Sequence, residues 1–132
     1  MAYRYIDLDF LAQVMDKRNI VQLSVDDDTV DIEDFDNVDD DVVEACENNA
    51  AYIVDNYLRR IFAIPLAGSN LTPEIKFIVA DLTRVSLWRR RDYLTTVADQ
   101  LHAEAIERLK RISQRDHEVR EGQTIAKVPA RT

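Results

Sequence analysis

Apolar residues recur along most of the chain at intervals of three or four positions, the repeat of α-helices that bury one face. This pattern predicts four helices, at about residues 7–17, 40–62, 73–90 and 95–114. The four apolar faces can share one hydrophobic core, so the predicted fold class is all-α, with about four helices around one core. The residues expected to form the apolar stripes are Phe10, Leu11, Val14 and Met15; Val42, Cys46, Ala50, Ile53, Tyr57 and Ile61, widened by Val43, Val54 and Leu58; Ile75, Ile78, Leu82 and Val85, flanked by Val79 and Trp88; and Val97, Leu101, Ala105, Leu109 and Ile112.

Side chains that accept hydrogen bonds from free amide groups stand at the predicted helix starts. The third helix has the strongest signal, because Thr72 can cap it and Pro73 suits its first position. Proline and glycine within residues 63–68 end the second helix. The remaining start signals are Asp7 or Asp9 for the first helix, the acids 39–41 for the second, and a possible capping box of Thr96 and Asp99 for the last.

Two segments lack a helical repeat. Residues 19–41 combine short β-branched pieces with a dense run of acids, which predicts a loop with at most one irregular extended segment. Val30, Ile32 and Phe35 are expected to attach this loop to the core. Residues 115–132 lose the periodicity as well, so the chain is predicted to consist of a helical domain at 1–114 and an extended C-terminal tail at 115–132, either disordered or ordered by a partner.

The net charge of −8 is unevenly distributed along the chain. Residues 1–58 carry 16 acids and 3 bases, whereas residues 59–132 carry 9 acids and 14 bases, giving −13 and +5. A field this acidic repels duplex DNA, so sequence-specific DNA binding by the N-terminal half is not expected. The opposite charges of the two halves favour head-to-tail contacts between copies, although two solvated faces explain them equally well.

The sequence offers little for catalysis or for a cofactor. Only two glycines are present, so no glycine-rich phosphate loop can form, and no serine stands in a nucleophile-elbow pattern. An EF-hand loop counted from Asp36 places Glu47 twelfth but puts Val38 third, where calcium needs an oxygen ligand. We therefore predict no enzyme activity, no cofactor and no specific metal site.

The chain also lacks targeting and disulfide signals. No run of about 18 apolar residues is present, and the N-terminus has no export signal, which predicts a protein without a membrane span. The single cysteine, Cys46, is expected to be buried in the core, and such cysteine usage suits the reducing cytoplasm of a bacterial host. His102 and His117 lack partners at metal-ligand spacing, and surface roles are expected for both.

Two groups of charged residues are candidates for contacts with partners. The arginines at the end of the third helix can pair with carboxylates or phosphates, and pairing with an acidic protein surface is favoured over nucleic acid because the same chain carries an acidic loop. The simple alternative is that these arginines only face water at the end of the helix. The arginines are Arg89, Arg90 and Arg91, and the acids expected on a channel or intersubunit surface are Asp26, Asp27, Asp28, Asp39, Asp40 and Asp41.

Several short elements resemble a known family. They are an opening tyrosine before a short capped helix, the run Ile20-Val21-Gln22-Leu23-Ser24 before an aspartate-rich loop, and Tyr57-Leu58 before Ile64-Pro65-Leu66. With these elements, residues 3–114 resemble the Mu-like prophage head proteins, which are similar to head-to-tail connector subunits. The chain departs from the family pattern in three respects: its acidic loop has no glycine, Phe62-Ala63 stands where an arginine-tyrosine pair is common, and its tail is longer.

The resemblance implies a structural subunit that acts by binding its neighbours. Such a subunit forms a ring, of twelve copies, between the portal protein and the next neck or tail component at the virion neck, after assembly in the host cytoplasm. DNA would pass its acidic channel surface without specific binding, and the C-terminal segment would dock onto the portal. Further partner contacts are expected from Arg115, Arg120, Ile125 and Val128.

Two other functions remain open from the sequence. The base-free stretch from Asn19 to Leu58 is also what an acidic inhibitor needs to mimic DNA and occupy a nucleic-acid enzyme. A calcium-dependent or hydrolytic domain is the third possibility, and a metal-dependent gain in stability would reveal it.

Overall fold

The computed structural model describes the backbone of residues 2–126 and the side chains of residues 2–114. This part of the chain contains helices and no β-strand, which confirms the all-α prediction. The α-helices are α1 (Leu8–Val14), α2 (Lys17–Ser24), α3 (Asp40–Leu58), α4 (Pro73–Arg90) and α5 (Thr95–Ala126), and two 3₁₀ turns, η1 (Phe35–Asn37) and η2 (Gly68–Asn70), interrupt the loops.

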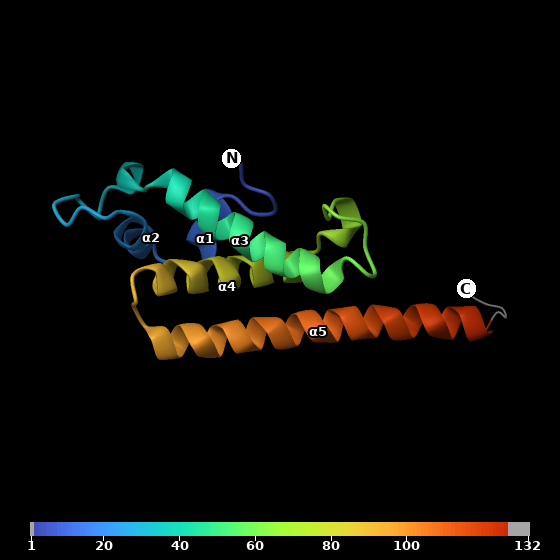
Figure 1. The fold of residues 1–132 in the computed structure, drawn as a ribbon. Coiled ribbons are helices and arrows are strands. Elements are labelled where there is room, and N and C mark those ends of the chain that lie inside the picture. The colour runs from blue at the N-terminus through green and yellow to red at the C-terminus, as the bar shows by residue number, and fades with distance from the viewer. Residues whose placement is uncertain (1, 127–132) are drawn as a thin grey trace.

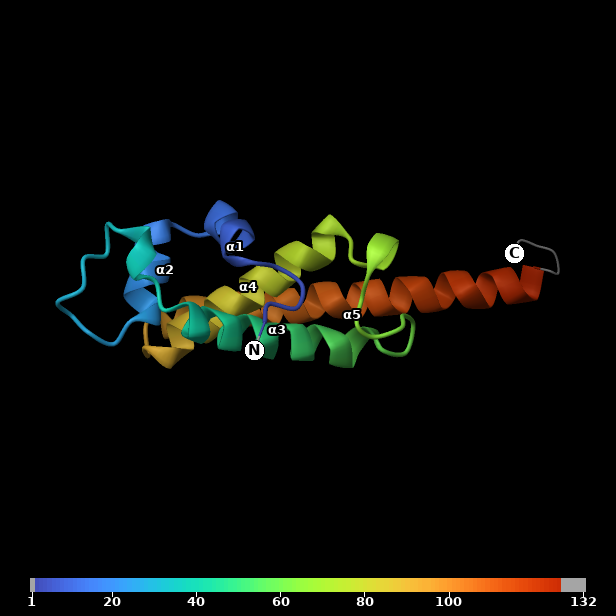
Figure 2. The ribbon, with the colours of Figure 1, turned by 90° about the horizontal axis from the view of Figure 1, so that it is seen from above.

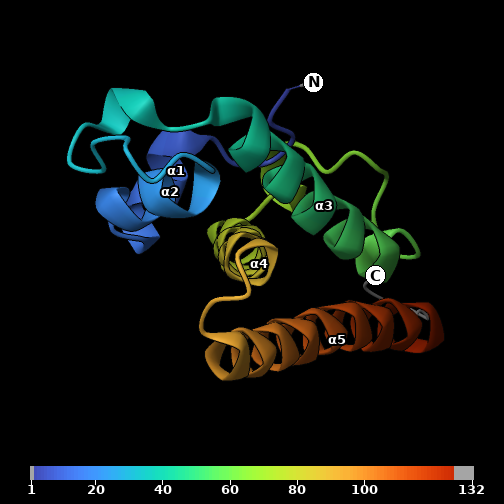
Figure 3. The ribbon, with the colours of Figure 1, turned by 60° about the vertical axis from the view of Figure 1, so that its left-hand side comes forward.

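Helix α4 lies in the middle of the molecule, with α3 and α5 packed on it and α1 and α2 along another side (Figure 3). Because neighbours surround it, α4 buries residues on most of its circumference. All six residues predicted for its stripe and flanks are buried, and Ala80, Thr83 and Leu87 are buried beside them. The six are Ile75, Ile78, Val79, Leu82, Val85 and Trp88.

Helix α5 is much longer than its neighbours. Its 32 residues span about 48 Å, against about 27 Å for the 18 residues of α4. The C-terminal part of α5 consequently extends past the ends of α3 and α4, and no other described element lies beside it (Figures 1 and 2). Ala105, Leu109 and Ile112 are buried as predicted, whereas Val97 is 45% exposed near the start of the helix.

The prediction that helical structure ends near residue 114 is wrong, since α5 continues to Ala126. Residues 115–126 have no proline, and half of them are arginine, glutamate, glutamine or alanine, which extend an existing helix at little cost even without an apolar stripe. The side chains of Arg115, Arg120 and Ile125 lie outside the described side chains, and Val128 lies outside the described residues. The domain boundary at 114 stays a prediction.

The segment after α1 also differs from the prediction, because residues 17–24 form α2 and not part of a loop. Asp16 caps this helix by accepting from the Arg18 N–H, and Ile20 and Val21 are fully buried. Their β-branched side chains suggested an extended segment, but packing against α4 outweighs that weak preference. Of the residues expected to attach the following loop, Phe35 packs on the core, whereas Val30 and Ile32 are only half-buried.

The second predicted helix, α3, ends at Leu58 and not at residue 62. The face of α3 that the core buries also differs from the predicted one. Val42, Ile53 and Tyr57 are only partly buried. The fully buried residues of α3 are Val43, Glu47, Ala50, Ala51, Val54 and Leu58.

Most of the predicted caps are present. Thr72 caps α4, and of the alternatives Asp7 and Asp9, Asp7 caps α1. Asp39, one of the three acids expected near the start of α3, caps that helix. Each side chain accepts a hydrogen bond from the backbone N–H three residues further on. The capping box of Thr96 and Asp99 is wrong, because α5 already begins at Thr95. In the turn that connects α4 to α5, the backbone of Asp92 and Leu94 adopts the left-handed region, at φ 52° and 49°.

We expect the Ile78→Ala variant to lower the free energy of unfolding by about 2–5 kcal/mol, because it removes a buried side chain and leaves a cavity at the centre of the core. Urea unfolding followed by circular dichroism measures this loss. Tyr52→Ala is the control: Tyr52 is 59% exposed, and we expect its replacement to change stability by less than about 0.5 kcal/mol. Equal losses for the two variants would contradict the burial of Ile78.

Candidate interaction surfaces

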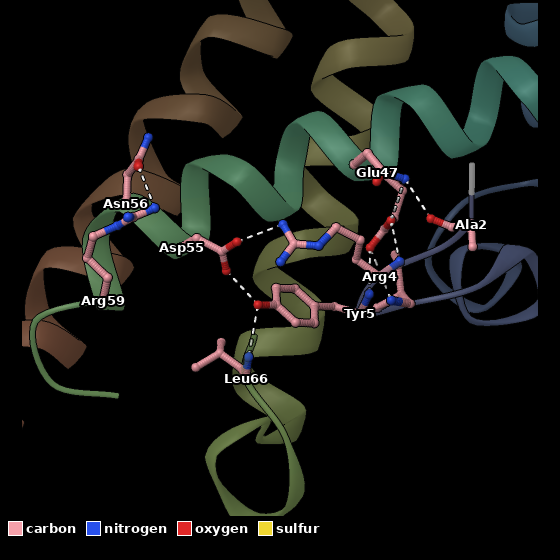
Figure 4. Close-up of polar contacts among 10 residues, drawn as sticks. Ala2, Arg4, Tyr5, Glu47, Asp55, Asn56, Arg59 and Leu66 are labelled. Atoms are coloured by element: carbon pink, nitrogen blue, oxygen red, sulfur yellow. Dashed lines mark hydrogen bonds and ion pairs between the residues drawn. The ribbon is translucent and has the colours of Figure 1, made fainter. Parts of the chain in front are cut away.

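Glu47 is fully buried on α3 and binds the backbone of the N-terminal segment (Figure 4). One carboxylate oxygen accepts from the Arg4 N–H at 2.9 Å, and the other accepts from the N–H groups of Tyr5 at 2.8 Å and Ile6 at 3.3 Å. Hydrogen bonds to a charged acceptor are stronger than neutral ones, and these three satisfy donors that have no helical partner. Glu47 therefore fixes the path of the segment before α1.

Asp55, two turns further along α3, holds the side chains of the same segment (Figure 4). It forms an ion pair of 2.7 Å with the Arg4 guanidinium and accepts a hydrogen bond of 2.5 Å from the Tyr5 hydroxyl. The Tyr5 hydroxyl in turn accepts from the Leu66 N–H at 3.0 Å. The network thus ties three distant parts of the chain together: the N-terminal segment, α3 and the loop before α4.

Sequence reasoning missed these two acids because the dense run of acids at residues 26–41 dominates the charge pattern of the N-terminal half. The available signal was their spacing: Glu47 and Asp55 stand eight residues apart, on the same face of α3 as Val43, Val54 and Leu58. Acids at such positions need partners, since an unpaired charge in the core is costly.

Many aspartates of the N-terminal half form local turns and caps. Asp27, Asp31 and Asp34 each accept a hydrogen bond from the N–H two residues further on. This is the Asx-turn geometry that aspartate favours in loops. The hydrogen bonds that Thr29 donates also lower the pKa of Asp27. Several acids of the loop therefore serve to stabilise the local fold of its own backbone.

The remaining predicted acids have different local roles. Asp26 pairs with Arg90, Asp39 caps α3, and Asp40 accepts a hydrogen bond of 2.5 Å from the Tyr3 hydroxyl. Asp28 and Asp41 are exposed. A channel or intersubunit surface made by the six acids stays a prediction.

The predicted arginines make contacts within the chain. Arg90 donates to the Leu23 carbonyl at 2.8 Å, and Arg91 donates to the carbonyls of Gln22 and Val25. These carbonyls belong to the C-terminal end of α2, where positive charge is favoured. Arg89 forms an ion pair with Asp99 instead. Partner binding by the three arginines stays a prediction.

A groove lies between α3 and α5, because both pack on α4 and touch each other less. It encloses about 510 Å³ and is lined by apolar Ile53, Tyr57 and Ile106. We call it the α3–α5 groove. Its other lining residues are Asn56, His102, Ala103, Glu107 and Lys110.

An adjoining cavity of about 380 Å³ reaches α4 and shares Ile53 and His102 with the groove. Burial lowers the pKa of His102, and the nearby charge of Arg89 lowers it further. Arg89 also lines this second cavity, where it lies 45% exposed.

The described residues carry no other obvious chemical site. Within them, no three histidine, cysteine, aspartate or glutamate side chains gather so that they could hold a metal ion. Cys46 is buried as predicted, and burial raises the pKa of its thiol. In the same part of the chain, no helix has both the length and the apolar character that a membrane crossing requires.

Comparison with known families decides the identity of the chain. The family model described as "Bacteriophage Mu, Gp36" matches residues 5–131, nearly the full length. The chain belongs to the bacteriophage Mu Gp36 family.

The Gp36 family is a phage family, and its member here is a structural protein associated with the phage particle. This confirms the Mu-like resemblance. No curated protein matches the chain, and no solved structure does. Two of the elements that carried the resemblance meet in the structure, since Tyr5 of the opening segment binds Leu66 of the proline-leucine pair.

In this Gp36 family member, we expect Glu47→Gln to lower the free energy of unfolding by about 1–3 kcal/mol, because the amide group can no longer accept from all three backbone donors. Hydrogen exchange at the amides of Arg4, Tyr5 and Ile6 should accelerate in the same variant. Glu104→Gln, an exposed substitution on α5, is the matched control and should leave both quantities unchanged. Unaltered exchange in Glu47→Gln would show that the carboxylate does not hold the segment.

Tyr5 should make the folded state sensitive to alkaline pH. Burial raises the pKa of Tyr5 from 10.0 to about 12, and its hydrogen bond to Asp55 adds to this shift. The unfolded chain releases this proton near pH 10, so the stability that Tyr5 contributes is complete below pH 10 and is lost as the pH rises toward 12.

The test is the free energy of unfolding measured against pH for the unmodified chain and for Tyr5→Phe. We expect a smaller loss between pH 10 and 12 in the variant, and an unchanged loss in the control Tyr52→Phe, whose side chain is exposed. Parallel curves for all three proteins would exclude a raised pKa at Tyr5.

Proposed function

We propose that this Gp36 family member is a head-completion or head-to-tail connector subunit. In this proposal, copies of the chain form a closed ring, of twelve subunits, between the portal protein and the next neck or tail component. The ring lines the DNA exit channel at the virion neck and is assembled in the host cytoplasm. The chain has no catalytic task and needs no cofactor, because its work is to bind neighbours in a fixed geometry.

The observation that carries the proposal is the projecting end of α5. About 20 Å of this helix extends beyond the bundle with no described element beside it (Figures 1 and 2). An isolated helical segment of this kind is marginal in water, because most helices in proteins are stabilised by packing. A partner that covers the projecting end explains why the chain carries it, and in a connector that partner is the portal protein.

The charge distribution gives further support to a ring. The acidic N-terminal half and the basic C-terminal half suit contacts between unlike surfaces of neighbouring copies, and such contacts close into rings. The exposed acids that remain unpaired, such as Asp28 and Asp41, suit a channel surface that repels DNA and lets it slide past.

The acidic inhibitor of a nucleic-acid enzyme has less support. A DNA mimic needs rows of free carboxylates that stand in for phosphates. Here Asp27, Asp31 and Asp34 bind their own backbone. Two of the remaining loop acids are paired, Asp26 with Arg90 and Glu33 with Arg18.

Electron cryomicroscopy of purified phage particles tests the connector role. We expect a closed ring next to the portal whose density accepts α3, α4 and α5, with the projecting end of α5 directed into the portal. Particles assembled without the chain serve as the control and should lack that ring. A complete neck whose density leaves no place for this fold would overturn the proposal, and salt-sensitive binding to a nuclease or polymerase would favour the inhibitor instead.

A further inference from the structure

The α3–α5 groove is an apolar depression with a basic rim. Ile53, Tyr57 and Ile106 are partly buried by the bundle, yet they line a space of about 510 Å³ that opens to the surface. Lys110 is exposed at the groove, and Arg89 borders the adjoining cavity. Arg90 lines that cavity as well, so three bases stand against one acid, Glu107, in the described lining of the groove and the cavity. Within the chain, Arg89 pairs with Asp99 and Arg90 pairs with Asp26.

The acidic loop, residues 26–36, has the opposite character. It contains seven acids and no base, and its half-buried Val30 and Ile32 do not join the core. Asx turns at Asp27 and Asp31 fix the backbone around these two aliphatic residues. Val30 and Ile32 line a hollow together with three of the loop acids, and Arg91 borders it on one side. The loop thus presents apolar side chains beside acids, and the groove presents apolar side chains beside bases.

The two surfaces face different directions. The acidic loop lies beyond α2, away from the part of the bundle where α5 packs on α4 (Figures 2 and 3). The groove is lined by residues of α3 and α5. In this arrangement, no residue of the loop lines the groove of the same copy. We propose that the acidic loop of one copy docks in the α3–α5 groove of the next. This contact rests on the proposed ring and identifies the surfaces that would build it.

The contact is heterologous, because it joins two different surfaces and leaves one loop and one groove free on each pair. Repetition of such a contact closes into a ring when the rotation between copies divides a full turn. Apolar burial of Ile32 against Ile53 and Ile106 supplies attraction, and the unlike charges set the register. The intrachain pair of Arg89 with Asp99, which is 72% exposed, contributes little and can yield to a carboxylate of the incoming loop.

Disulfide trapping tests the contact directly. A full-length chain with both Ile32→Cys and Ala103→Cys places one thiol in the loop and one at the groove, while native Cys46 is buried and does not compete. The matched control pairs Ile32→Cys with Glu104→Cys, which is the next residue of α5 and does not line the groove. Both proteins are assembled into phage particles and oxidised, and the products are separated without reductant.

We expect a ladder of covalent dimers, trimers and higher multimers from the first pair and mostly monomers from the control. Equal ladders from the two pairs would overturn the contact. Particles whose necks contain the ring but give no ladder would also overturn it and leave the connector role intact. Absence of the chain from the neck would overturn the connector role and the contact together.

A charge exchange provides an independent readout. Lys110→Glu should weaken association between subunits roughly tenfold, because like charges then face each other across the interface. Arg111→Glu alters the next residue, which is exposed outside the groove, and should have no such effect. Adding Asp28→Lys and Asp36→Lys, two exposed loop acids whose side chains take no part in the Asx turns, to the Lys110→Glu chain should restore association. Equal effects of Lys110→Glu and Arg111→Glu, or no restoration, would contradict the proposed pairing.

Discussion

Coverage of α4 is the constraint on which the rest of the structure depends. This helix has apolar residues on most of its circumference, so no single neighbour can remove it from water. Helices α3 and α5 each cover one side of α4, and α1 and α2 cover another. Since α3 and α5 are both directed toward α4, a groove remains between them. The main surface feature of the protein is thus a consequence of how its core is closed.

Buried polar contacts then fix the segments that the core alone cannot position. The N-terminal segment forms no helix before Leu8, and its amide groups would lack partners without Glu47. Asp55 orients Arg4 and Tyr5 in the same region. Removal of one partner from such a network leaves a buried charge or donor unpaired, which costs more than the hydrogen bond itself contributes. These acids therefore restrict the N-terminal segment to one arrangement.

Burial of α4 and the buried polar contacts leave three separate features at the surface of the protein. Several acids and arginines are used in caps and turns or in contacts with the end of α2, and the charges that remain unpaired are distributed unevenly. A projecting helix, an apolar groove and an acidic loop then lie in different parts of one subunit. In the proposed connector, these three features would supply the contacts between copies and with other particle components.

The sequence by itself determined the all-α class, the start of α4 at Pro73, the buried stripe of α4 and its cap at Thr72, because helical periodicity and capping are local properties. Only the tertiary structure decided that residues 17–24 are helical, that Glu47 and Asp55 lie inside, and that Arg90 and Arg91 bind the end of α2. Each of these depends on a partner far away in the chain. Local patterns carry no information about such partners, so the packing of the helices had to supply it.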